Sequence, residues 1–290
     1  MIAASYILLR FIHFTSLILL TGCASYRAIL APEEYAGLLW SHLKIGAVCA
    51  AIIALVSAVA MFAVQTILMS GATDGIWQAS VWNAVSGTRF GQAWLPEMLL
   101  ALLCVLLLSF NSRRAGFLLL AGCVVGLMFM AMTGHAAMHD GIRGLAGQVS
   151  QTVHLTAATF WCGGLFPLLW LMKQASSRPD DNNAIRTMMR FSRYGHWAVA
   201  LTIISGVLNT LLIAGFPLHF SAWLLWLLFK VSLVLLMVVI ALYNRYWLVP
   251  RFSRCPEPSR RWFIRLTQLE LFVSLVVIAV VSWFATLSPV

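Results

Sequence analysis

The chain has 290 residues, of which 61% are hydrophobic and only 10% are charged. Soluble domains average about 25% charged residues, so this composition excludes an ordinary soluble enzyme and a disordered chain. The formal charge of +10 is typical of the basic cytoplasmic loops of a membrane protein, and we expect no nucleic-acid partner.

Eight apolar runs are each long enough to cross a bilayer, which takes about 20 residues. In chain order they cover residues 5–29, 44–69, 91–110, 115–134, 149–173, 188–214, 222–247 and 263–287. The first run is too long for a signal-peptide core, and no A-x-A cleavage site follows it, so it is kept as a span. No internal repeat is evident. The sequence therefore predicts an all-α, polytopic membrane bundle of eight helices, with residues 1–290 in one domain and no soluble domain.

The distribution of basic residues predicts the orientation of these spans. Fifteen Lys and Arg side chains lie in or beside the segments after spans one, three, five and seven, whereas only Arg89 and Arg143 follow spans two, four and six. Basic loops stay in the cytoplasm. Both termini are therefore predicted to face the periplasm of a bacterial inner membrane.

Ionisable side chains within a bilayer are costly and are functional candidates by default. Five such groups fall in the outer half of the predicted bundle: His13, Glu97, His135, His139 and His154. Three further polar residues within spans are candidates for a structural or gating role: Arg10, Lys230 and Asn244. Simpler roles remain open, namely helix–helix hydrogen bonds for the histidines, a solvated position for His139, and an ion pair with Arg10 or Lys230 for Glu97.

The residue types in this group favour copper. Met128, Met132, His135 and His139 are spaced i, i+4, i+7 and i+11, so they form one stripe if the helix continues that far. Thioethers suit Cu(I), and imidazole suits either oxidation state. Magnesium or calcium would need an oxygen cage, and zinc would prefer cysteines or more carboxylates. Ordinary packing remains the alternative for the methionines.

The six cysteines form no C-x-x-C pair, and five of them lie in apolar runs. This spacing excludes the common zinc, thioredoxin and haem-attachment motifs. The cysteines are interpreted as small apolar side chains.

Several short motifs, in order and spacing, resemble the copper resistance protein D (CopD) membrane family along the whole chain, closest to its single-domain branch. They are RFIHF at 10–14, GHA at 134–136, HLTAATFWCGGLFPLLW at 154–170, RFS at 190–192, SGVLN at 205–209 and NRYWLVP at 244–250. The resemblance implies an inner-membrane protein of copper homeostasis that moves copper from periplasm to cytoplasm, with a separate periplasmic CopC-type partner. It also implies that His13, His135 and His154, which lie in matching motifs, bind the metal.

Three functions remain open at this stage. The first is a copper permease, which is not an enzyme and is not ATP-driven, because no Walker A motif or aspartyl-phosphate site is evident. The second is a haem b electron-transfer protein that reduces Cu(II) or a quinone, with His13 and His154 as axial ligands. The third is a non-transporting membrane partner of a periplasmic copper protein.

Overall fold

The structure is a computed structural model that describes residues 2–177, 182–216, 219–253 and 255–287. These residues form nine α-helices and no strand. The helices are α1 (Ile2–Ser25), α2 (Glu33–Ser70), α3 (Ala79–Ser86), α4 (Arg89–Leu107), α5 (Arg113–Ala131), α6 (Gly141–Ser177), α7 (Asn182–Ala214), α8 (Ala222–Tyr243) and α9 (Pro256–Phe284).

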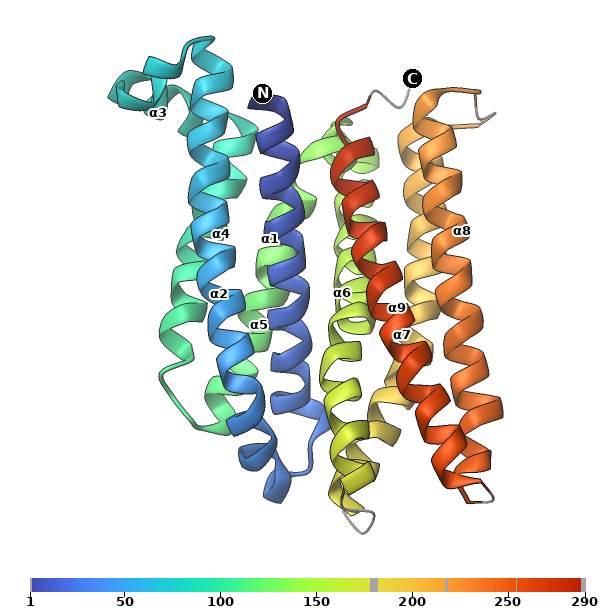
Figure 1. Cartoon of the computed structure of the whole chain (residues 1–290). Coiled ribbons are helices and arrows are strands. Elements are labelled where there is room, and N and C mark those ends of the chain that lie inside the picture. Colours follow the sequence, from blue (N-terminus) through green and yellow to red (C-terminus); the bar gives the residue numbers. More distant parts are fainter. Residues whose placement is uncertain (1, 178–181, 217–218, 254, 288–290) are drawn as a thin grey trace.

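All of these helices except the short α3 are long and apolar enough to cross a membrane, which confirms the predicted all-α bundle of eight spans. The largest boundary error is at α2, which begins at Glu33 rather than at the predicted residue 44. It begins earlier because Leu39, Trp40 and Leu43 extend its buried face. The start of α1 and the end of α9 lie at the same end of the bundle, here called the terminal end, together with α3 (Figure 1). The side of the membrane that this end faces stays a prediction.

The bundle consists of two halves that repeat the same pattern of helix contacts. In the first half α1 packs on α2, and α4 packs on α5. In the second half α6 packs on α7, and α8 packs on α9. The two halves meet at the centre, where α1 packs along α6, while α5 also contacts α6 and α9 contacts α1. The structure therefore contains an internal repeat that the sequence analysis missed.

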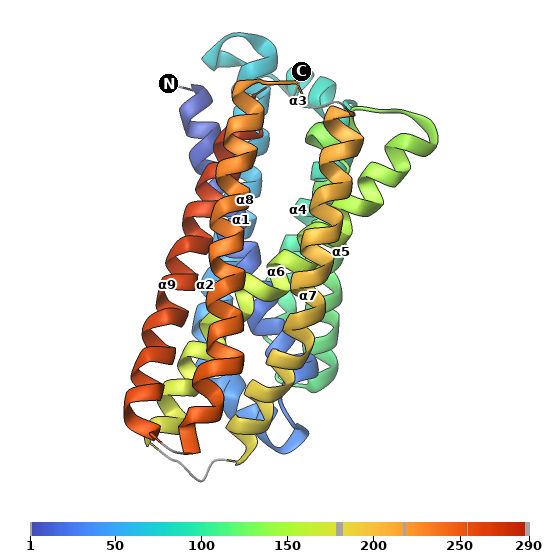
Figure 2. The same ribbon diagram turned by 90° about the vertical axis from the view of Figure 1, so that its right-hand side faces the viewer.

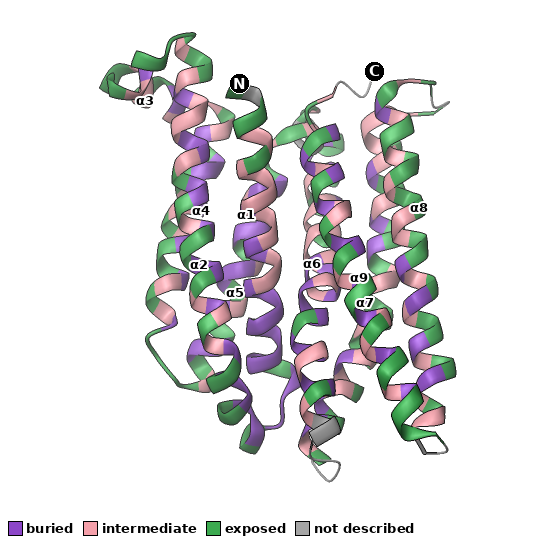
Figure 3. Ribbon diagram, in the orientation of Figure 1, coloured by how far each residue is buried: buried purple, intermediate pink, exposed green. Residues whose placement is uncertain are grey.

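The two halves differ at one pair of helices. In the first half α2 packs on α4, but the corresponding helices α7 and α8 have almost no direct contact among the described residues. Figure 2 shows α7 and α8 as ribbons that stay apart over most of their length. Figure 3 shows most of the buried residues on the central helices and far fewer on α8, the least buried span.

The central contact between α1 and α6 depends on two glycines. A Cβ atom added to Gly163 would collide with the backbone carbonyl of Ile18, and one added to Gly22 would collide with the backbone of Gly163. The two backbones therefore touch, as is common where small residues line membrane helices. Gly163 of the run Trp161-Cys162-Gly163-Gly164 therefore has a packing role.

Candidate metal site

His13 on α1 is completely buried and is held by the neighbouring helix α2. Its Nδ1 lies 3.1 Å from the Ala54 carbonyl oxygen and 3.0 Å from the Ser57 hydroxyl. A carbonyl oxygen can only accept a hydrogen bond, so Nδ1 carries a proton and donates it. In the neutral ring, Nε2 is then left with a free lone pair.

That lone pair faces a buried carboxylate on α4. His13 Nε2 lies 3.4 Å from Glu97 Oε1, and the two side chains are 0% and 2% exposed. Neither His13 Nε2 nor Glu97 Oε2 has a hydrogen-bond partner among the described residues. Buried polar atoms without a partner are costly, so the lone pair of His13 Nε2 and the Glu97 carboxylate are suited to bind a cation between them.

Trp94, one turn before Glu97 on α4, covers this pair. Its ring centroid lies 5.5 Å from that of His13, and its indole N–H donates to the Ala58 carbonyl at 2.9 Å. A histidine that ligates a metal usually donates its other ring N–H to a carbonyl or carboxylate, which fixes the ring. The bond from His13 to Ala54 has this form.

His154 on α6 repeats the arrangement in the second half of the bundle. Its Nδ1 lies 3.0 Å from the Thr202 carbonyl oxygen and 3.1 Å from the Ser205 hydroxyl, both on α7. The Nδ1 atom is again the proton donor. The partner of Nε2 is different, because here it is the Lys230 ammonium of α8, with Nζ at 3.5 Å.

The repeat is also visible in the sequence once the structure aligns its two halves. HFTSLILLTG at 13–22 matches HLTAATFWCG at 154–163, with the histidine, a threonine and the central glycine in the same register. On the following helices LVSAV at 55–59 matches IISGV at 203–207, which places Ser57 and Ser205 in register. Sequence analysis missed both serines, because three identities in one segment and two in the other carry no weight without a known alignment.

The two halves therefore differ in charge at the same histidine atom. A carboxylate beside Nε2 attracts a cation, whereas an ammonium repels one and can itself donate to the lone pair. His13 with Glu97 is suited to bind a metal ion, and His154 is capped by Lys230.

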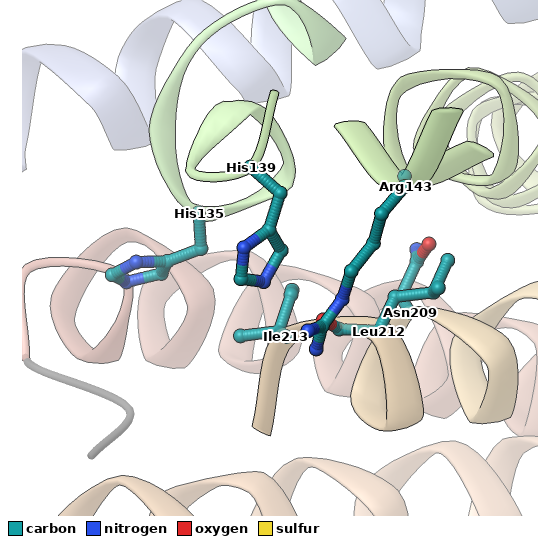
Figure 4. Close-up of a pocket in the computed structure, with 7 residues that line it drawn as sticks. His135, His139, Arg143, Asn209, Leu212 and Ile213 are labelled. Carbon is teal, nitrogen blue, oxygen red and sulfur yellow. The ribbon is translucent and has the colours of Figure 1, made fainter. Parts of the chain in front are cut away.

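His135 and His139 line a separate pocket at the terminal end, together with Arg143 of α6 and Asn209, Leu212 and Ile213 of α7 (Figure 4). The Nε2 atoms of both histidines are buried and have no hydrogen-bond partner in the part of the chain that the structure describes. Burial, and secondarily the charge of Arg10, lowers the pKa of His135. The ring of His135 is therefore neutral at pH 7 and can act as a ligand.

The predicted methionine–histidine stripe is wrong. Helix α5 ends at Ala131, and Gly134 has φ of +72°, a left-handed conformation that a continuing α-helix does not allow. Met128 and Met132 are 44% and 40% exposed. The two methionines and the two histidines thus do not share one helical face.

Two other candidate residues have partners that the sequence did not indicate. The Arg10 guanidinium lies 5.5 Å from the Phe14 ring centroid, and Asn244 donates to the Glu270 carboxylate at 3.2 Å. Within residues 2–177, 182–216, 219–253 and 255–287, no group of three or more His, Cys, Asp or Glu side chains is placed to hold a metal ion. The assignment of His13, His135 and His154 as metal ligands stays a prediction.

Comparison with known proteins gives the family. Residues 1–145 match the family model described as copper resistance protein D-like, N-terminal domain, and residues 185–284 match the model for copper resistance protein D. The chain belongs to the copper resistance protein D family. This confirms the predicted resemblance. The first match covers α1 to α5 and the first residues of α6, and the second runs from α7 to the end of α9. The protein is thus a multi-pass inner-membrane member of a copper resistance and transport family.

Two curated relatives and one solved structure are similar to this family member. It is 41% identical to inner membrane protein YebZ of Escherichia coli K12 over the full length of both chains. It is 30% identical to copper resistance protein D of Pseudomonas syringae pv. tomato, with 98% of this chain and 96% of that protein covered. The bd oxidase of Geobacillus thermodenitrificans matches with a TM-score of 0.62 at 9% identity, over 99% of this chain and 86% of that chain. The similarity to the bd oxidase is a similarity of fold alone.

Proposed function

We propose that this protein takes up copper at the periplasmic face and moves it toward the cytoplasm, with His13 and Glu97 as its intramembrane binding site. The observation that carries this proposal is the fully buried pair of His13 Nε2 and Glu97 at 3.4 Å, in which one atom of each side chain lacks a hydrogen-bond partner among the described residues. Membership of a copper resistance family supports copper as the cargo, and imidazole suits both of its oxidation states.

The other predicted residues have different roles in this proposal. His135 and His139 at the terminal end make the first contact with the ion, delivered by a separate periplasmic protein of the CopC type. His154 becomes a ligand only when the Lys230 ammonium moves away from its Nε2 atom, so Lys230 is a gating residue. Since no ATP-binding motif is evident in the sequence, the movement is driven by a gradient or is passive.

The test is the metal content of the detergent-purified protein, measured by elemental mass spectrometry after incubation with Cu(I) and desalting. We expect bound copper in the wild type and the loss of one copper equivalent in His13→Ala and in Glu97→Gln. His219→Ala, in an exposed turn between α7 and α8, is the matched control and should keep the copper. Full occupancy in both site variants would overturn the proposed site.

The same measurements distinguish the two alternative functions. Iron in place of copper would support the haem b electron-transfer protein. A docking protein that does not transport copper predicts that His13→Ala leaves both partner binding and cellular copper unchanged. The transport proposal instead predicts lower copper accumulation in cells that express His13→Ala than in cells that express His219→Ala.

A further inference from the structure

A small cavity continues inward from the carboxylate of Glu97, enclosed by α1, α2, α4 and α5. Its lining includes Glu97 and Cys104 from α4, and Gly122 and Cys123 from α5. The cavity therefore joins the proposed copper site to two buried thiols that have no role in the proposed site of His13 and Glu97.

The register of α4 places the carboxylate and one thiol on the same face. Cys104 follows Glu97 by seven residues, which is two helical turns or about 10 Å along the axis. Leu100 and Ala101, which lie between them, also line the cavity. Helix α4 runs away from the terminal end, so the thiol lies deeper in the bundle than the carboxylate (Figure 1).

The thiols of Cys104 and Cys123 are neighbours. Each interacts most strongly with the other, and the two residues are 4% and 2% exposed. The absence of a side chain at Gly122 leaves room for the pair, because a Cβ atom there would lie 2.9 Å from Cys104 Sγ.

We propose that Cys104 and Cys123 form a second, sulfur-based site that receives Cu(I) from His13 and Glu97. The proposal rests on the proposed function, because it places the thiols on the inward route of the ion. Soft thiolates select Cu(I) over the harder divalent cations. Cys104 and Cys123 are the two sulfur-bearing residues among the described residues that line the cavity.

The transfer is balanced in charge and in protons, with no change in the oxidation state of copper. The ion leaves a neutral imidazole and a carboxylate and bonds to two sulfur atoms, each of which gives up its proton. Glu97 accepts one proton, and His13 Nε2 accepts the other. A positive ion bound to one carboxylate is thereby replaced by a bis-thiolate copper anion, a protonated imidazole and a neutral acid, so the total charge of the cavity stays the same.

The test is X-ray absorption at the copper edge of the full-length protein loaded with Cu(I) in detergent, together with its Cu(I) affinity measured against a chromogenic chelator. We expect sulfur ligands in the wild type. Cys104→Ser and Cys123→Ser should each lose them and bind Cu(I) at least tenfold more weakly. Cys49→Ser, which removes an exposed thiol of α2, is the matched control and should behave as the wild type.

A second measurement does not depend on the folding of any variant. In the wild type, bound Cu(I) should protect Cys104 and Cys123 from alkylation by a small membrane-permeant reagent, as judged by mass spectrometry of peptides, and should leave Cys49 reactive. Alkylation of these two cysteines to the same measurable extent with and without bound Cu(I) would overturn the sulfur site. So would a copper spectrum with nitrogen and oxygen ligands alone.

The two proposals fail in different ways. If Glu97→Gln keeps copper on sulfur after direct loading with Cu(I), the thiol pair binds on its own, which supports the second site. If the wild type binds copper through nitrogen and oxygen alone and Glu97→Gln abolishes that binding, the sulfur site is wrong and the proposed function stands. If the wild type binds no Cu(I), both are wrong.

Discussion

Replacement of Lys230 by methionine should create a new copper site at His154. The two histidines of the repeat make the same Nδ1 bonds to a carbonyl and a serine, and they differ in the group beside Nε2. Methionine keeps most of the length and apolar volume of the lysine side chain, removes its charge and supplies a thioether that suits Cu(I).

The size of the effect follows from the distance between Lys230 Nζ and His154 Nε2, which is 3.5 Å. A copper ion bound to that nitrogen would require the ammonium to move aside, to a distance of about 4 Å from the ion. Two like unit charges at this distance repel by about 4 kcal/mol at an effective dielectric constant of 20. Since each 1.4 kcal/mol is a factor of ten, the lysine weakens binding at His154 by roughly a thousandfold.

The assay is Cu(I) titration of the detergent-purified protein against a chelator of known affinity. Lys230→Met should bind one more copper equivalent than the wild type, and the double variant Lys230→Met/His154→Ala should return to the wild-type value. Unchanged stoichiometry in Lys230→Met would refute the electrostatic argument. Loss of wild-type copper in Lys230→Met would show instead that the lysine supports the existing site.

Three further predictions concern the fold. Gly163→Ala should lower the Tm in detergent by disrupting the α1–α6 contact, at a cost of at least 1–3 kcal/mol by the usual measure of overpacking, whereas Gly195→Ala, with open space around it, should not. Arg27→Leu should also lower the Tm, because the buried Arg27 donates to the carbonyls of Phe110 and Ser112 at 2.8 and 2.9 Å, and a hydrogen bond that involves a charged group contributes about 1.5–3 kcal/mol. A reporter fused to the C-terminus should be active in the periplasm, and cytoplasmic activity would reverse the predicted orientation.

The eight spans were predictable because a bilayer demands a minimum length of apolar helix, and that demand acts on each segment separately. The error at α2 has a related cause. Leu39 and Trp40 are buried inside the protein, so they extend the helix without facing lipid, and a search for membrane-spanning apolar runs leaves them out. Charged residues within spans were also predictable as candidates, since each of them is exceptional in an apolar run.

Partnership between those residues was not predictable, because it depends on which helices are neighbours. Glu97 was considered as a partner of Arg10 or Lys230, and the structure pairs it with His13. The methionine stripe was wrong because a spacing argument assumes a continuous helix, and α5 ends before Gly134. The cysteines were interpreted as packing residues because the two that pair lie nineteen positions apart, on different helices.

The repeat suggests why one half of the bundle binds the ion. Two hairpins, α1–α2 and α6–α7, present histidines held in the same way, so the histidines alone do not distinguish the halves. The residue from the next span does, because Glu97 adds a negative charge and Lys230 a positive one. In the first half α2 packs on α4 and encloses a cavity that leads from the carboxylate to a thiol pair, whereas α7 and α8 have almost no contact among the described residues. The negative charge of Glu97 and the enclosed cavity both favour a cation in the first half. The proposed path of copper along α4 and α5 therefore follows from the repeat and from these two differences between its halves.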